Sequence, residues 1–253
     1  MLERLDYVKL APRRVLDAGS GPQREARLLA RRYRGAEVIA LDFARGLLRA
    51  GKSRFTFFER NSPRPVCADF LRLPLAAASI DLVWSNMVLH WAADPLAALR
   101  EFHRVLAVDG LLMFSTLGPD TLAELRAAAG AARVHPFADM HDLGDMLLAA
   151  GFAEPVMDME RITLVYADGA ALLADLRASG QTCALAGRVG EKRRGLAGRG
   201  FLASLHARLA AQLREGKLPV NFEVVYGHAW RAPARRGPKQ RSEERRVGKE
   251  CRL

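Results

Sequence analysis

The stretch VLDAGSGPQ, residues 15–23, decides the fold of this chain. It runs from apolar residues into a turn that contains Gly19 and Gly21, and a helical pattern follows over 23–34. An apolar run that ends in a glycine turn is typical of a buried strand in a parallel sheet, and glycine lets the backbone pass close to a bound molecule. The stretch therefore predicts a strand, a turn and a helix that meet a nucleotide-like ligand.

Strand and helix patterns alternate through the first half of the chain, as a parallel sheet covered by helices requires. Asp94 followed by Pro95 is typical of a helix start, and it opens the helical pattern over 94–106. We expect strands over 14–19, 37–43, 66–70, 80–89 and 111–117. Right-handed crossovers would join them into a doubly wound, Rossmann-like α/β sheet with its ligand at the carboxyl edge.

The second half of the chain is less regular. It predicts helices over 119–132, 140–152, 169–180 and 201–216, and long strands over 154–168 and 220–230. We expect the two strands to form an antiparallel hairpin at the sheet edge, with the helices inserted as a lid. The expected organisation is a ligand-binding core over 1–118, a lid and sheet edge over 119–231, and a tail over 232–253.

The charge of the chain is concentrated at its end. The formal net charge is +11, which first indicates a nucleic-acid partner. However, nine lysines and arginines against three glutamates lie in residues 231–253, where no apolar periodicity exists. We therefore expect a disordered and non-native basic tail that resembles translated vector sequence, and no nucleic-acid partner.

The cysteines and the apolar runs indicate the cellular compartment in which we expect the protein. Cys67, Cys183 and Cys251 have no metal-ligand spacing, so they read as isolated thiols in a reducing compartment. No run approaches the roughly 20 apolar residues of a membrane span. We expect a soluble, cytoplasmic protein without a metal site.

The glycine turn does not match a dinucleotide site. That fingerprint uses a third glycine for close packing of the helix, and Arg24 holds its position here. It also has no role for Asp17, which precedes the turn. A carboxylate at this place can accept hydrogen bonds from an ammonium group or from water, so Asp17 favours a cationic ligand.

Polar side chains recur where the expected strands end. Asp42 closes the second strand, where its carboxylate can bind both ribose hydroxyls, and Asp69 closes the third. The expected donor-binding residues are Asp17, Gly19, Gly21, Asp42, Phe43, Asp69, Phe70 and Asn86. S-adenosylmethionine, a cation with a ribose and an adenine, satisfies this set. The alternative is that the aspartates only form turns at strand ends.

Longer stretches resemble known proteins. VLDAGSGP, VIALDF and ADFLRLPLAAASIDLVWSNMVLHW are similar to the class I methyltransferases. SNMVLHW, FSTLGPDTL, HPFADMHDLGDMLLAAGFAEPVMD and VNFEVVYGHAW are more specific, and they resemble the malonyl-[acyl-carrier-protein] O-methyltransferase family of biotin synthesis. The resemblance spans residues 13–231 and implies methyl transfer from S-adenosylmethionine to the free carboxylate of a malonyl thioester.

This chemistry sets modest demands on the site. A carboxylate is already a nucleophile at neutral pH, so we expect neither a general base nor a metal, and we assign no catalytic residue. The acyl group must still be held. The candidates are His90 beside Trp91, and the guanidinium forks of Arg177, Arg188 and Arg199. Each arginine has the alternative interpretation of a solvated surface residue.

The implied partner is an acidic acyl carrier protein that carries malonyl, or else malonyl-coenzyme A. The basic stretch 188–199 is a candidate docking site for such a protein, and a solvated loop is the alternative. Relatives usually begin with a helical segment that closes over the donor, and MLERLDYVKL resembles only its end. Two other hypotheses stay open. The short N-terminal segment leaves open a truncated donor-binding module without activity. The other is a protein-arginine hydroxylase of methyltransferase fold that assists respiratory-complex assembly.

Overall fold

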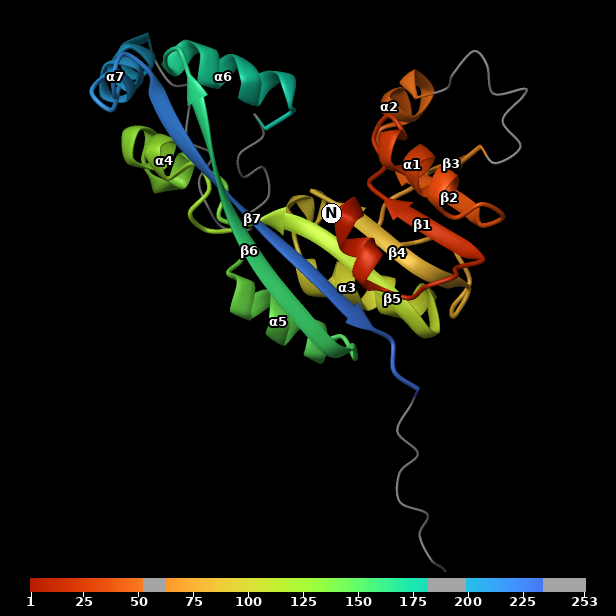
Figure 1. Cartoon of the computed structure of the whole chain (residues 1–253). Helices are drawn as coiled ribbons and strands as arrows, with labels where there is room; N and C mark the ends of the chain where they lie inside the picture. The colour runs from red at the N-terminus through yellow and green to blue at the C-terminus, as the bar shows by residue number, and fades with distance from the viewer. Residues whose placement is uncertain (52–61, 182–198, 234–253) are drawn as a thin grey trace, which may run out of the picture.

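The computed structural model describes residues 1–51, 62–181 and 199–233, and they form one seven-stranded sheet in the order β3-β2-β1-β4-β5-β7-β6 (Figure 1). The first five strands pair in parallel, whereas β7 is antiparallel to both β5 and β6. The strands are β1 (Arg14–Ala18), β2 (Glu37–Asp42), β3 (Arg64–Cys67), β4 (Ile80–Asn86), β5 (Leu106–Leu117), β6 (Ala153–Tyr166) and β7 (Leu218–Trp230). The expected doubly wound sheet with an antiparallel edge hairpin is confirmed.

Helices cover both faces of the parallel part. On one face α1 buries Ala26 and Leu29 against the sheet, together with Leu5 of the short helix η1. On the other face α3 and α5 bury Phe102 and Leu147. The helices of this part are η1 (Leu2–Tyr7), α1 (Arg24–Arg32), α2 (Arg45–Ala50), η3 (Leu89–Trp91), α3 (Pro95–Val105) and α5 (Met140–Ala149). As the sequence predicts, Asp94 caps α3 by accepting the N–H of Ala97.

Three further helices gather at the far end of the β6–β7 hairpin, away from the parallel strands (Figure 1). They are α4 (Ala123–Ala129), α6 (Gly169–Ala178) and α7 (Arg199–Ala210), with η4 (Ala131–Arg133) after α4. Leu125, Leu172 and Leu209 form a core of their own there with Leu218 and Val220 of β7. The expected inserted helices therefore exist, and they rest on the hairpin.

Several element boundaries differ from the prediction, and three of them bear on the site. The third strand ends at Cys67, so Asp69 lies two residues beyond it, and the fourth ends at Asn86. The helix expected over 119–132 begins only at Ala123. The buried Glu223 of β7 accounts for this last difference, because its carboxylate accepts the N–H of Asp120 at 2.8 Å and holds the preceding residues in a turn.

Some sequence predictions fall outside the described residues. The basic tail, apart from its first two residues, and most of the stretch 188–199 belong to this group. Within the described residues, no helix is long and apolar enough to cross a membrane.

Gly227 of β7 offers a test of how tightly the hairpin packs. A Cβ added there would lie 2.4 Å from the Phe114 ring and 2.9 Å from the Met157 sulfur, so Gly227→Ala overpacks the core. We expect a loss of about 1–3 kcal/mol in the free energy of unfolding, measured by urea denaturation. Gly46→Ala in α2 is the control, because nothing lies within 4 Å of its added Cβ. Equal stability of the two variants would contradict this packing.

Candidate active site at the carboxyl edge of the sheet

The glycine turn after β1 allows other groups to lie close to its backbone. Gly19 and Gly21 have φ angles of +80° and +49°, in the region that favours glycine. A Cβ at Gly19 would lie 2.3 Å from the Val88 side chain, whereas a Cβ at Gly21 would meet nothing within 4 Å. Gly19 is therefore needed for packing against the segment after β4, and Gly21 leaves open space beside the turn.

The helix after this turn packs differently from the dinucleotide fingerprint. Arg24 is exposed, and Ala26 takes the buried place against the sheet. The missing third glycine therefore costs no packing. Gln23 has a φ of 62° and buries its side chain by donating from Nε2 to the Leu48 carbonyl at 2.7 Å.

Asp17 is the most unusual ionisable group of the site. It lies in β1, is 1% exposed, and its Oδ2 has no hydrogen-bond partner among the described residues. Burial, with smaller contributions from the negative charges of Glu25 and Asp42, raises the pKa of Asp17 well above its usual range. A buried carboxylate with a free oxygen fits a cationic group such as the ammonium of an amino acid.

Asp42 orients the turn from the neighbouring strand. Its Oδ2 accepts the N–H of Gly21 at 2.8 Å and its Oδ1 accepts the N–H of Ala44 at 2.7 Å. Each carboxylate oxygen has a second lone pair, so this side chain keeps the capacity to accept from a ribose. Asp42 therefore fixes the shape of the turn as well as facing the expected ligand.

The expected adenine end contains Asp69, Phe43 and Phe70. Asp69 is fixed by accepting the N–H of Leu71 at 2.8 Å. The two rings differ: Phe43 is 77% exposed, whereas Phe70 packs on Phe102 with ring centroids 6.3 Å apart. Phe43 is thus the more accessible ring for a flat ligand.

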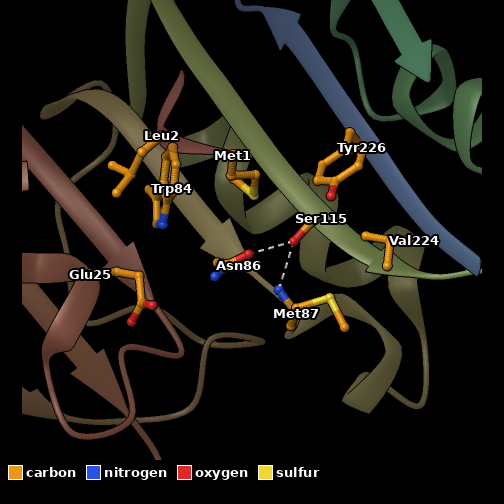
Figure 2. A pocket seen from close by; sticks show the side chains of 9 residues that line it. All are labelled: Met1, Leu2, Glu25, Trp84, Asn86, Met87, Ser115, Val224 and Tyr226. Atoms are coloured by element: carbon orange, nitrogen blue, oxygen red, sulfur yellow. Dashed lines mark hydrogen bonds between the residues drawn. The ribbon is translucent and has the colours of Figure 1, made fainter. Parts of the chain in front are cut away.

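A pocket of about 260 Å³ continues the edge beyond β1, at the carboxyl ends of β4 and β5 and beside the middle of β7 (Figure 2). Asn86 forms part of its wall, as the sequence led us to expect, and Ser115 donates a hydrogen bond to Asn86 Oδ1 at 2.6 Å. The described residues that line it are Met1, Leu2, Glu25, Trp84, Asn86, Met87, Ser115, Val224 and Tyr226. The strand order places this pocket directly beside the Asp17 carboxylate, since Asp17 and Trp84 are register partners on β1 and β4.

The short helix η1 covers the pocket and is tied to the hairpin. Arg4 forms an ion pair with Asp158 at 2.5 Å and lies over the Tyr226 ring, 4.1 Å from its centroid. The guanidinium of Arg4 lowers the pKa of Asp158. Leu5 on the same helix is buried in the core, whereas Tyr7 is 89% exposed and covers nothing.

Of the four expected acyl-binding residues, the structure describes the side chains of His90 and Arg177. His90 is buried between the rings of Trp91 and Phe137, and burial lowers its pKa to about 4, which leaves a neutral imidazole. It does not line the pocket. Arg177 is exposed near the end of α6. Arg188 and the side chain of Arg199 lie outside the described residues.

The sequence prediction included Asn86 and missed the other eight described lining residues, of which Glu25, Trp84, Ser115 and Tyr226 carry a polar side-chain atom. Ser115 could have been found, because it lies near the end of a predicted strand, as Asn86 does. Glu25 lies in the first turn of α1, directly after the glycine turn. Tyr226 lies in mid-strand, and only the antiparallel pairing of β7 brings it to the carboxyl edge of β5.

Comparison with known proteins defines the class. A family model described as a methyltransferase domain matches residues 16–114. The YcgJ protein of Bacillus subtilis superposes with a TM-score of 0.64 at 16% identity, over 92% of this chain and 97% of that one. Phosphoethanolamine N-methyltransferase 2 of Haemonchus contortus, solved with S-adenosyl-L-methionine, gives 0.60 at 16% identity over 92% and 51%. The fold is that of the class I methyltransferases.

Curated relatives define the family. Malonyl-[acyl-carrier protein] O-methyltransferases from Gallionella capsiferriformans and Methylovorus sp. are 52% and 51% identical over 93% of this chain, which covers 82% and 81% of their lengths. The Legionella pneumophila protein of the same name is 38% identical over 93% of this chain and 83% of its own length. The chain belongs to the malonyl-[acyl-carrier protein] O-methyltransferase family.

Asp17→Asn tests the free carboxylate oxygen. Because the folded-state pKa of Asp17 is raised, the ionised form destabilises the ligand-free protein as pH rises above the usual aspartate range. The asparagine has no such charge, so we expect a higher melting temperature than wild type at pH 7.5. We also expect S-adenosylmethionine to bind about ten- to a hundredfold more weakly, since a hydrogen bond to a charged group is lost.

Thermal melts with and without the donor measure both effects together. The prediction fails if Asp17→Asn melts below wild type, or if the donor raises both melting temperatures equally. Asp142→Asn on the outer face of α5 is the matched control, because Asp142 is exposed and far from the glycine turn in the fold.

Proposed function

We infer that the protein transfers a methyl group from S-adenosylmethionine to the free carboxylate of malonyl carried by acyl carrier protein, an early step of biotin synthesis. The observation that carries this inference is 52% identity over 93% of the chain. That span is far longer than the methyltransferase domain at 16–114, so it includes the hairpin and most of the inserted helices. The names of these relatives do not favour a protein-arginine hydroxylase or a module without activity.

The donor site is proposed along the first four strand ends. The Asp17 carboxylate would hold the ammonium group, and Asp42 the ribose. Asp69, Phe43 and Phe70 would flank the adenine, while Gly19 and Gly21 admit the ligand close to the backbone. When bound, S-adenosylmethionine supplies an electrophilic methyl group on a sulfonium. Asn86 lies where this set meets the pocket, between the donor and the acceptor.

The chain itself needs to orient the acceptor rather than activate it. A malonyl carboxylate with an ordinary pKa near 4 is ionised at neutral pH. Proximity and alignment can lower a barrier by about 7–11 kcal/mol. Met1 and Leu2 form part of the pocket wall. The neutral imidazole of His90 is proposed as a hydrogen-bond donor to the acyl group when the inserted helices close over it.

The remaining part of the proposal concerns the carrier. We propose that Arg177, Arg188 and Arg199 hold the acyl group or the acidic face of the carrier protein. The organisation into a donor-binding core over 1–118 and a lid over 119–231 suits this division. The separate apolar core under α4, α6 and α7 supports it, because these helices pack on the hairpin rather than on the parallel strands.

The reaction is tested with donor labelled in the methyl group. We expect label on malonyl-acyl carrier protein that is released as methanol by mild base, because a methyl ester is base-labile whereas N-methyl and C-methyl groups are not. Asp17→Asn should lower this transfer about ten- to a hundredfold at limiting donor. Base-stable label, or donor binding without any transfer, would overturn the carboxyl-methylation proposal.

Salt dependence tests the docking proposal. If basic residues bind an acidic carrier, raising the ionic strength from 0.05 to about 0.5 M should increase KM for malonyl-acyl carrier protein about tenfold or more. The same change should affect KM for a malonyl-pantetheine thioester, which lacks the protein surface, much less. Equal salt effects on the two acceptors would contradict docking through charge.

A further inference from the structure

Ser115 of β5 is 1% exposed, and its hydroxyl links two neighbouring residues of the pocket wall (Figure 2). Its Oγ accepts the backbone N–H of Met87 at 3.1 Å and lies 2.6 Å from Oδ1 of Asn86. A backbone N–H can only donate, so the single hydroxyl proton is left for Asn86 Oδ1. The donors and acceptors are therefore fixed: the N–H of Met87 donates to Ser115 Oγ, and the Ser115 hydroxyl donates to Asn86 Oδ1.

This pattern of donors and acceptors fixes the amide of Asn86. With the amide turned over, its Nδ2 would face Ser115 Oγ, and the buried hydroxyl proton would lose its acceptor. Leaving a buried hydroxyl proton without an acceptor is unfavourable, so the arrangement with Oδ1 on Ser115 is favoured. The two N–H groups of Nδ2 then have no partner within the described part of the chain, and Asn86 lines the pocket.

The charge distribution of the pocket indicates which ligand group the Asn86 N–H groups bind. Among its nine described lining residues Glu25 is the single charged one, and it belongs to α1 beside the Asp17 carboxylate. This end repels an anion and attracts a cation. Val224 and Tyr226 come from β7 on the other side of β5, where no described lining residue is charged. Behind them the Arg4 guanidinium lies 4.1 Å from the centre of the Tyr226 ring, and the Tyr226 hydroxyl donates to Glu160 at 3.3 Å. An anionic acceptor thus belongs toward β5 and β7, with Asn86 between the two ends.

We propose that Ser115 is a positioning residue for Asn86, and that the Asn86 amide donates to the acceptor carboxylate through the oxygen that is not methylated. The inference rests on the proposed function and assigns these two residues to the acceptor side of it. In the step itself a carbon–oxygen bond forms, the carbon–sulfur bond breaks with its electron pair returning to sulfur, and no proton moves. A neutral amide orients the carboxylate without cancelling its charge, so the attacking oxygen stays nucleophilic.

A double-mutant cycle tests this arrangement in the full chain. Asn86→Ala and Ser115→Ala are each expected to lower kcat/KM for malonyl-acyl carrier protein about ten- to a hundredfold. The double variant should be no worse than Asn86→Ala, because Ser115 acts through Asn86. A purely structural role of Ser115 in the strand would give additive losses instead. In either single variant the loss of affinity for malonyl-acyl carrier protein should exceed any loss of affinity for S-adenosylmethionine, although the sequence also predicts Asn86 beside the donor.

Ser85→Ala is the matched control. Ser85 is the neighbouring serine on β4, fully buried like Ser115, and its hydroxyl has no partner among the described residues. Its side chain points to the opposite face of the strand from Trp84, so its removal should leave kcat/KM unchanged. Melting temperatures of all variants check that each one folds.

The same cycle is run on binding of malonyl-acyl carrier protein to the complex with S-adenosylhomocysteine, measured by calorimetry. Two outcomes overturn the inference and leave the proposed function standing, provided that wild type turns over. One is that the losses of the two single variants add in the double variant. The other is that a single variant loses as much affinity for the donor as for the acceptor. Wild type that neither binds nor methylates the carrier overturns both. Non-additive losses in binding as well as in turnover establish Ser115 as the residue that positions Asn86.

Discussion

The burial of the Asp17 carboxylate, with one oxygen unpartnered among the described residues, is the constraint on which the proposed donor half of the site depends. The carboxylate lies in the second-last position of β1, covered by α1, and one of its oxygens makes no bond among the described residues. Burying such a group is unfavourable, and the raised pKa of Asp17 expresses that cost. In the proposed donor site a bound cation would offset this penalty, which gives the ligand-free fold a preference for a cationic donor.

Neighbouring features keep this arrangement in place. The N–H groups of Gly19 and Ser20 both donate to the Leu41 carbonyl, at 2.8 and 2.9 Å, which binds the turn to the end of β2. Asp42 then holds the N–H of Gly21 from the same strand. Since Gly19 also packs against Val88, the turn is fixed from β2 on one side and from the segment after β4 on the other.

The parallel core could be predicted well from sequence, because its signals are local. A buried strand followed by a glycine turn, or Asp94 before Pro95, identifies an element without knowledge of its neighbours. The predicted donor residues also follow from this, since carboxyl ends of parallel strands share one edge. The late start of α4 was not predicted because it depends on a residue distant in the sequence. Glu223 lies 102 positions after Thr121. Its carbonyl accepts the Thr121 hydroxyl and its carboxylate accepts the N–H of Asp120.

The acceptor side could not be predicted in the same way, because it is made by antiparallel pairing. β7 enters the sheet between β5 and β6 and runs against β5, with Tyr226 as the register partner of Ser115. Tyr226 has no sequence pattern that indicates a site, and its place beside Ser115 depends on a hairpin formed by residues late in the chain. The prediction instead favoured arginines and a histidine, whose chemistry is conspicuous in a sequence.

The order of the strands explains why the two halves of the site differ in charge. Along the edge from β3 to β1 the side chains are carboxylates, Asp69, Asp42 and Asp17, which suit a cation that carries hydroxyl and amine groups. From β4 to β7 the polar groups are neutral, Asn86, Ser115 and Tyr226. In the proposed site, a cationic donor and an anionic acceptor would be attracted to opposite ends of this edge, with their reacting groups beside Asn86. For a reaction between a sulfonium and a carboxylate, this separation is a large part of what the protein must supply, because the reacting groups need alignment rather than activation.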